Sequence, residues 1–303
     1  MSKDGIVVSV ICQTYNHEKY LKDTLNSILN QRTNFNFEVI VHDDASEDGN
    51  QKIIREYAEA YPEKVIPIIQ EVNQYRQGKN IIKQFVLPKV RGKYIAFCEG
   101  DDFWIDNNKL QKQVDYMDSH EECTLCIHNS IDVDLHGEKI AEKIISSISK
   151  EYSVDEVIAG GGAFCYFNSI MFPARVSGKL IKYLDIISID LVWQMLLASF
   201  GQTYLIADKM SAYRKDVPGS WTKRMRTDLE AKKGVLLKII EVYDLFDKDS
   251  DRKYHRAITI QKFKAQIEIV RINKKQENKM YKRLFFTLIR LCMQIRLSFM
   301  KLI

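Results

Sequence analysis

Short apolar runs alternate with amphipathic stretches through the first 120 residues, and this alternation restricts the fold more than any other feature. The runs are rich in β-branched residues, which is typical of buried strands, and the stretches between them place apolar residues at helical spacing. Strands separated by helices imply right-handed crossovers and a mostly parallel sheet. The predicted strands are Ile6–Cys12, Phe37–His42, Val65–Gln70 and Lys93–Cys98, and the predicted helices are His17–Asn30, Gln51–Tyr61, Lys79–Val90 and Asn108–His120.

Polar clusters directly follow three of the predicted strands. Thr14-Tyr15-Asn16 comes after the first strand, Asp43-Asp44-Ala45-Ser46 after the second and Glu99-Gly100-Asp101-Asp102 after the fourth. Ligands of such α/β sheets bind beyond the carboxyl ends of the strands, so the three clusters are predicted to converge on one site. The carboxylates of the last cluster are a donor set that suits Mg²⁺ or Mn²⁺.

The second half of the chain is less regular, and its charge changes sign. Residues 222–303 contain 21 Lys or Arg and 9 Asp or Glu, whereas residues 1–221 contain 24 and 31. We therefore expect an α/β domain over 1–221 and a basic helical extension over 222–303 that meets an anionic partner. Further predicted elements are strands at Thr124–Val133 and Asn168–Phe172, a loop at 160–162, a helix at Leu191–Phe200, extended segments at Thr203–Ala207 and Ser211–Arg214, and helices from Asp228 onward.

The six cysteines lack the spacing of a disulfide framework, and we interpret them as reduced thiols of a cytoplasmic protein. No signal peptide is visible, and no uncharged apolar run reaches the ~18–20 residues that a membrane span needs. Cys123-x-x-Cys126 with His128 lacks the second cysteine pair of a structural zinc site, so zinc is the weaker interpretation of that motif.

Three stretches make the sequence resemble the family 2 glycosyltransferases of the GT-A fold, especially bacterial enzymes of capsule and cell-surface polysaccharide assembly. They are residues 8–17 (VSVICQTYNH), 38–49 (EVIVHDDASEDG) and 94–104 (YIAFCEGDDFW). Residues 188–193 (SIDLVW) and 211–216 (SAYRKD) resemble later segments of the family. The resemblance implies a GT-A (Rossmann-like) α/β fold, with a mixed, mostly parallel sheet flanked by helices.

The resemblance also implies a nucleotide-sugar donor, with UDP as the expected nucleotide, and Mn²⁺ or Mg²⁺ as the cofactor. In Glu99-Gly100-Asp101, Glu replaces the first Asp of the family's Asp-x-Asp element, so Asp101 would bind the metal and Glu99 would assist. Trp104 and Asn168 would contact the sugar of donor or acceptor. The residues implied to line the base and ribose pocket are Thr14, Tyr15, Asn16, Asp43, Asp44, Lys79 and Asn80.

Asp190 fits the family's catalytic base, which takes the proton of the acceptor hydroxyl as that oxygen attacks the anomeric carbon. One base and one displacement imply inversion at that carbon. Arg214 would offset phosphate charge. Asp216 falls where many relatives carry a histidine and is a further candidate metal ligand. The expected acceptor is a growing surface glycan, including one carried on a lipid.

Simpler interpretations exist for several of these residues and for the function. Asp43 and Ser46 are typical of turns and caps, and Asp190 or Asn16 could be helix caps only. A sugar nucleotidyltransferase of related fold is one alternative, but residues 13–16 replace the Gly-rich loop with Arg and Lys that would hold a triphosphate. A nucleic-acid-binding protein is the other, and the aromatic residues of the tail lie mostly on the apolar side of its predicted helices.

Tyr281–Ile303 combines a broad apolar surface with Arg283, Arg290 and Lys301 on one helical arc. This pattern predicts an amphipathic helix at an anionic membrane surface rather than a membrane span. Docking of the same helix on its own domain or on a second subunit, which would give a homodimer, is the alternative. We therefore expect a cytoplasmic protein that can lie on the inner face of the cell membrane.

Overall fold

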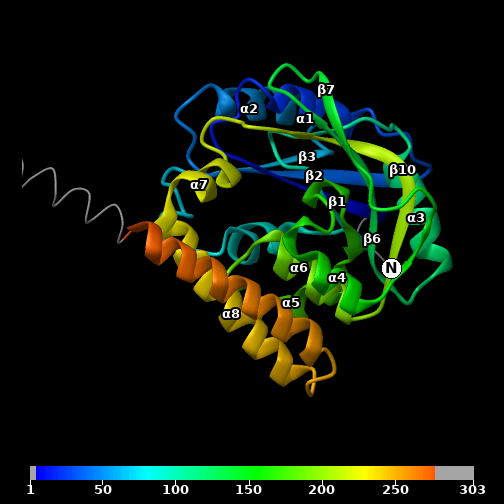
Figure 1. Cartoon of the computed structure of the whole chain (residues 1–303). Helices are drawn as coiled ribbons and strands as arrows, with labels where there is room; N and C mark the ends of the chain where they lie inside the picture. The colour runs from blue at the N-terminus through cyan, green and yellow to red at the C-terminus, as the bar shows by residue number, and fades with distance from the viewer. Residues whose placement is uncertain (1–4, 277–303) are drawn as a thin grey trace, which may run out of the picture.

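The computed structural model describes residues 5–276, and its strands form one sheet with helices on both faces (Figure 1). The strands are β1 Ile6–Thr14, β2 Asn36–Asp43, β3 Val65–Ile69, β4 Tyr94–Phe97, β5 Phe103–Trp104, β6 Cys123–Val133, β7 Lys139–Lys143, β8 Lys150–Tyr152, β9 Met171–Pro173 and β10 Gln202–Arg214. Their order is β3-β2-β1-β4-β9-β6-β10-β5, with β7 paired to β6 and β8 to β10. The pairings of β1 with β2 and β4, of β2 with β3, and of β6 with β10 are parallel. The predicted mixed, mostly parallel sheet is confirmed.

Helices cover the two faces of this sheet and bury separate apolar clusters against it. The α-helices are α1 Leu21–Leu29, α2 Asn50–Ala60, α3 Lys109–Ser119, α4 Val154–Gly160, α5 Ser177–Leu184, α6 Asp190–Ser199, α7 Trp221–Thr227 and α8 Leu229–Asp249, and residues 255–276 are also helical. Val10 and Cys12 of β1 pack with α1, α2 and α3, whereas Ile11 packs on the other face with α4, α5, α6 and α8. This alternation follows from the two-residue period of a strand.

Strand β10 is longer than the sequence pattern indicates. Thr203–Ala207 and Ser211–Arg214, predicted as two extended segments, belong to one strand. Its register with β6 shifts on both sides of Lys209. The charged residues Asp208 and Lys209, at the register shift between the two segments, interrupt the apolar alternation, which explains why the sequence pattern divides the strand.

Two other predicted elements are shorter than expected. Within Asn168–Phe172, strand β9 starts only at Met171, because Phe167–Ser169 forms a 3₁₀ turn. Within Lys79–Val90, a π-helical turn at Ile82–Val86 leads into a 3₁₀ turn whose proline cannot continue the helix. Elements β5, β7, β8, α4 and α5 were not predicted.

The C-terminal helices pack on the α/β body. Val242, Tyr243 and Phe246 of α8, with Tyr254 and Ile258, belong to the same buried cluster as the side chains of α5 and α6. Figure 1 shows α8 and the helix 255–276 as an antiparallel pair at the edge of the molecule. None of the helices in the described part of the chain is long and apolar enough to cross a membrane. The predicted amphipathic helix at 281–303 lies outside the described residues.

Candidate active site

The carboxyl ends of β1, β2 and β4 lie side by side because β1 pairs with both other strands. Asn50 links two of them, since its Nδ2 donates to Thr14 Oγ1 at 2.9 Å and to Asp43 Oδ2 at 2.8 Å. The backbone N–H of Gly100 donates to the carbonyl of Gln13 at 2.9 Å and so holds the end of β4 against β1. The structure thus brings together the three polar clusters that the sequence places at strand ends.

Gly100 allows the acidic turn to approach the end of β1 closely. A Cβ atom at this position would lie 2.5 Å from Thr14 Oγ1 and 3.0 Å from His17 Nδ1. His17 Nε2 lies 3.7 Å from Asp101 Oδ2, and its Nδ1 is buried without a hydrogen-bond partner in the described part of the chain. His17 is not among the residues to which the sequence assigned a role, but it ends the first stretch that resembles the family and directly follows the first polar cluster.

Glu99 and Asp190 are two of the acidic groups at the site whose pKa is raised, and Asp102 is a third. Glu99 follows β4, and Asp190 is the first residue of α6. Burial, and then the charges of Asp190 and Asp101, raise the pKa of Glu99 well above its ordinary value. Burial raises the pKa of Asp190 to about 6, although the backbone N–H at the helix start opposes this change. Because the charge of one carboxylate disfavours ionisation of the other, the pair retains a proton to higher pH than an isolated carboxylate.

Asp102 is buried, and the fold uses its carboxylate. Oδ2 accepts a hydrogen bond from Asn168 Nδ2 at 2.8 Å, and Oδ1 accepts one from the backbone N–H of Arg214 at 2.9 Å. Thr24 Oγ1 donates to the Asp102 carbonyl at 2.6 Å. These contacts connect the turn after β4 to β10 and α1, so Asp102 fixes the backbone that carries Asp101.

The structure does not support the predicted sugar contacts of Trp104 and Asn168. Trp104 is 3% exposed, its Nε1 donates to the Asn168 carbonyl at 3.1 Å, and the Lys109 ammonium lies 4.1 Å from its ring. Asn168 is fully buried, and its Oδ1 accepts from Ser211 Oγ at 2.7 Å. Neither side chain presents a free polar group or ring face to a ligand. Asn168 instead donates to Asp102 of the acidic turn, and Trp104 holds Asn168.

Arg214, predicted to offset phosphate charge, is buried behind the acidic turn. Its Nε donates to the Asp101 carbonyl at 3.0 Å, and its Nη2 lies 3.3 Å from Asp23 Oδ2. The guanidinium also lies 4.6 Å from the centre of the Tyr20 ring, and Nη1 donates to the carbonyls of residues 134 and 135. A direct phosphate contact is therefore not supported, and these bonds indicate a residue that holds the Asp101 peptide.

Asp44 organises the loop that follows β3. Its carboxylate accepts from the backbone N–H of Gln74 at 2.7 Å and from the next N–H at 3.1 Å. Lys79 Nζ donates to Gln74 Oε1 at 2.7 Å, which fastens the far end of the same loop. Asn80 instead donates to the carbonyl of Leu184 at 2.8 Å. All three of these predicted pocket residues, Asp44, Lys79 and Asn80, have side chains that already make hydrogen bonds within the fold.

Tyr15 and Asn16 lie where the loops after β1 and β2 meet. Asn16 adopts φ 56°, and its Oδ1 accepts from the backbone N–H of Glu47 at 2.8 Å. The exposed Arg76, which was not predicted, donates from Nη2 to the Tyr15 hydroxyl at 3.3 Å, and its guanidinium lies 5.8 Å from the ring centre. This cation and aromatic ring form an accessible pair that suits a base or a phosphate.

The residues of the acidic turn fit a divalent metal, and the ion would relieve the repulsion among them. Among residues 5–276, no three His, Cys, Asp or Glu side chains form a ready-made cage. Mg²⁺ that binds substrate phosphates needs only one or two protein carboxylates, which Asp101 and Glu99 would supply. The predicted ligand Asp216 is paired with Arg226 Nη1 at 2.9 Å, and its side chain is 69% exposed.

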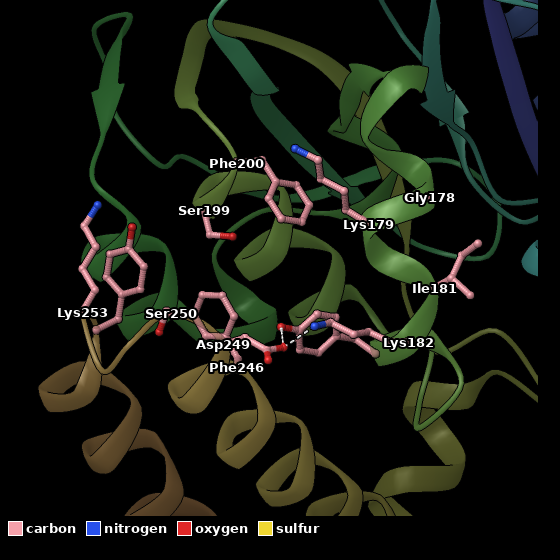
Figure 2. Close-up of a pocket in the computed structure, with 12 residues that line it drawn as sticks. Gly178, Lys179, Ile181, Lys182, Ser199, Phe200, Phe246, Asp249, Ser250 and Lys253 are labelled. Atoms are coloured by element: carbon pink, nitrogen blue, oxygen red, sulfur yellow. Dashed lines mark hydrogen bonds and ion pairs between the residues drawn. The ribbon is translucent and has the colours of Figure 1, made fainter.

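A separate cavity of about 750 Å³ lies at the opposite end of α6 (Figure 2). It is bordered by α5 and by the C-terminal ends of α6 and α8, and Lys182 Nζ pairs with Asp249 Oδ2 across it at 2.5 Å. None of the predicted site residues is among the described residues that line this cavity. The acidic site and the cavity are therefore different features of the molecule.

The sequence is similar to a known protein family and to individual proteins of bacteria. The sequence model of a family described as Glycosyl transferase family 2 matches residues 9–180. An uncharacterised protein of Mycobacterium tuberculosis is 36% identical over 214 residues, which cover 71% of this chain and 60% of that protein. UDP-Glc:alpha-D-GlcNAc-diphosphoundecaprenol beta-1,3-glucosyltransferase WfgD of Escherichia coli is 32% identical over 114 residues, or 38% of this chain and 42% of that enzyme. The chain thus matches less than two thirds of the length of either relative.

A solved structure has a similar fold. The structure of S. aureus TarS in complex with UDP-GlcNAc superposes with a TM-score of 0.57 and covers 88% of this chain and 79% of that chain. The two sequences are 18% identical, so the likeness shows the fold alone.

Proposed function

The chain belongs to glycosyl transferase family 2 and has a GT-A-like fold, and on that premise we propose that it transfers a sugar from a UDP-sugar to an acceptor hydroxyl with inversion at the anomeric carbon. The observation that carries this proposal is the position of Asp190. It begins α6, perturbs the pKa of Glu99 in the acidic turn, and itself has a pKa raised to about 6. A carboxylate with such a pKa beside a cluster of strand-end acids suits general-base chemistry at neutral pH.

Asp190 accepts the acceptor's proton in this proposal. As the acceptor O–H bond breaks, the proton moves to the Asp190 carboxylate and the oxygen forms a bond to the anomeric carbon. The bond from that carbon to the diphosphate breaks, and the diphosphate leaves with the electron pair. A single displacement inverts the configuration at the anomeric carbon. Glu99 tunes the base, because its state of ionisation changes the field at Asp190.

Asp101, assisted by Glu99, would hold the divalent ion, Mn²⁺ or Mg²⁺, and Arg214 and Asp102 keep the Asp101 backbone in place. When bound, the ion would supply positive charge that stabilises the leaving diphosphate. Asp216 can join this group only if it gives up its pairing with Arg226.

The loops after β1, β2 and β3 would hold the nucleotide. Tyr15 and its partner Arg76 offer the accessible ring and cation, and Lys79 is exposed at the end of the same loop. The hydrogen bonds of four further residues hold these loops in place: Thr14, Asn16, Asp43 and Asp44. Asn80 would act indirectly, because its hydrogen bond to the Leu184 carbonyl fixes the end of the loop.

The acceptor that we propose is a growing cell-surface glycan, including one carried on a lipid diphosphate. The support is the similarity to WfgD, a glucosyltransferase whose UDP-glucose donor and diphosphoundecaprenol-linked acceptor are of this type. Such an acceptor would place the protein on the inner face of the cell membrane, with 281–303 as the predicted contact. A homodimer through the same segment remains the alternative.

The test is a panel of nucleotide-sugars, with donor hydrolysis and transfer measured in the presence and absence of Mn²⁺. With the donor found, Asp190→Asn should abolish transfer and leave metal-dependent UDP binding intact, whereas Asp101→Ala should weaken that binding. Glu56→Gln is the control, because Glu56 is an exposed carboxylate on α2 outside the site, and it should retain UDP binding.

Two results would contradict the assignment. Absence of metal-dependent binding or turnover with every donor would remove the proposed reaction. If Asp190→Asn lost nucleotide binding while Asp101→Ala kept it, the roles of the two residues would be exchanged.

A further inference from the structure

The helix formed by residues 255–276 has one apolar face buried on α8 and a second apolar stripe that faces solvent. The buried face includes Ile258, Ala265 and Ile272, seven residues apart. The exposed stripe repeats at intervals of three and four residues, which keeps its members on one arc of the helix. Phe263, within it, is 61% exposed. The members of this outer stripe are Ile260, Phe263, Ile267 and Val270.

Cations share the arc of the outer stripe. At helical spacing, Arg256, Lys264, Arg271 and Lys274 fall among or beside its apolar residues. Glu268 is the one acidic residue between positions 255 and 276, and it pairs with Lys232 of α8 at 2.6 Å and with Arg271 of its own helix at 3.5 Å. The outer face therefore combines exposed apolar groups with positive charge and presents no free carboxylate of its own helix.

This charge pattern favours one of three binding partners that could cover the outer stripe. A second copy in a two-fold dimer would bring the same cations against one another without acidic partners. The segment 281–303 of this chain carries five Lys or Arg and no Asp or Glu, so it would meet the stripe with like charge as well. An anionic lipid bilayer offers what the face lacks, namely negative headgroups for the cations and an apolar boundary for the stripe.

We propose that the outer face of the helix 255–276 is a membrane-binding surface that lies in the headgroup region of an anionic bilayer. The helix pair then acts as a platform, because the inner face of the same helix is fixed to α8 and through it to the core of the α/β body. This surface is separate from the predicted contact at 281–303. The inference does not depend on the sugar-transfer reaction.

The test uses the full chain and vesicles of phosphatidylcholine with or without phosphatidylglycerol. Sedimentation should show binding to the anionic vesicles that weakens as salt is added. Phe263→Ser should weaken it about tenfold, since burying such a side chain is worth roughly one factor of ten or more. Lys264→Glu should weaken it further at low salt.

Matched controls separate this surface from general effects. Ile148→Ser removes an apolar side chain that is 66% exposed between β7 and β8, and Lys52→Glu reverses an exposed charge on α2. Both should bind vesicles like the unaltered chain. Thermal melting and UDP binding should be unchanged in Phe263→Ser and Lys264→Glu, which shows that the fold and the donor site are intact.

Three outcomes would overturn the proposal. The first is no binding of the unaltered chain to anionic vesicles. The second is equal binding of Phe263→Ser, which would assign any affinity to charge alone, as for a polyanion such as nucleic acid, or to 281–303. The third is a dimer in light scattering that Phe263→Ser converts to a monomer, which would assign the stripe to self-association. Failure of the donor screen would leave all three measurements interpretable.

Discussion

In and beside the acidic turn, some carboxylates oppose folding because burial disfavours their charge. Neighbouring side chains hold these carboxylates in place through hydrogen bonds. Glu99 and Asp190 are half-buried near one another, and their ionised forms are disfavoured. Asp102 is fully buried, and burial raises its pKa well above the ordinary value, although hydrogen bonds from Asn168 and the Arg214 backbone N–H oppose this change. A functional site of this kind stores unfavourable charge that the surrounding hydrogen bonds offset.

Asp190→Asn should therefore stabilise the protein at neutral pH while it abolishes transfer. The pKa of Asp190 rises from 3.8 to about 6 on folding, so the folded state binds a proton more tightly than the unfolded chain does. The wild-type chain loses this stability as pH rises from about 4 through 6, and the full cost is present above that range. Melting temperatures across pH 4 to 8 should show a gain for Asp190→Asn above pH 6 that shrinks toward pH 4.

Glu56→Gln provides the comparison, because this carboxylate is exposed on α2. Its melting temperature should follow the wild-type chain across the same pH range. A loss of stability in Asp190→Asn at pH 8 would show that the ionised carboxylate makes a net favourable contact, contrary to the burial that we describe.

At the scale of single elements, a few hydrogen bonds between neighbouring strands position the site. The backbone N–H groups of Arg91 and Gly92 both donate to Ser9 Oγ on β1, just before β4 begins. Ser9 in turn donates to the buried carboxylate of Glu38 on β2 at 2.6 Å. This network joins the amino ends of the three strands whose carboxyl ends carry the site.

Gly92→Ala should disrupt this network. A Cβ atom there would lie 2.5 Å from the Ser9 backbone nitrogen and 2.8 Å from the Tyr94 carbonyl, and backbone atoms cannot move away as a flexible side chain can. We expect a loss of about 1–3 kcal/mol in unfolding free energy, measured by urea denaturation.

The matched substitution is Gly178→Ala in α5, where no atom lies within 4 Å of the added Cβ. It should be neutral or stabilise the chain by up to about 1 kcal/mol, because alanine is the better helix former. Equal stability of Gly92→Ala and the wild type would mean that the start of β4 can shift without cost.

At the scale of the whole molecule, the C-terminal helices share a buried apolar cluster with residues 1–221, so the two parts are not independent units. The C-terminal helices contribute Phe246 and its neighbours to the cluster that also holds α5 and α6, and α6 begins with Asp190. The extension therefore supports the element that carries the proposed base. The helix 255–276 packs on α8, and α8 packs against α6. This packing connects the proposed membrane-binding surface to the site.

Phe246→Ala should destabilise the whole chain in one cooperative transition. The cost of truncating a buried phenylalanine is about 3–5 kcal/mol, and calorimetry should show a single lowered melting transition. Leu237→Ala, at a position on α8 that is exposed, should change the melting temperature little. Two transitions, of which only one responds to Phe246→Ala, would instead support an independent unit at 222–303.

The sequence by itself determined the parallel strands β1 to β4, the positions where β1, β2 and β4 end and the grouping of acids near these ends. These follow from local periodicity and from the rule that parallel strands share one carboxyl edge, so Thr14, Asp43 and Asp101 could be placed together without coordinates. Some local signals were missed, such as the capping box of Ser153 and Glu156 that starts α4.

Only the tertiary structure decided which polar side chains are available to a ligand. Asn168 and Arg214 lie 66 and 112 residues from Asp102 along the chain, yet both donate hydrogen bonds to its carboxylate. Their burial, and that of Trp104, depends on how β10 and the turn before β9 close over the acidic turn. Residue type can indicate a ligand, but burial and hydrogen-bond partners come from segments distant in sequence, so the local pattern could not distinguish a sugar contact from a support.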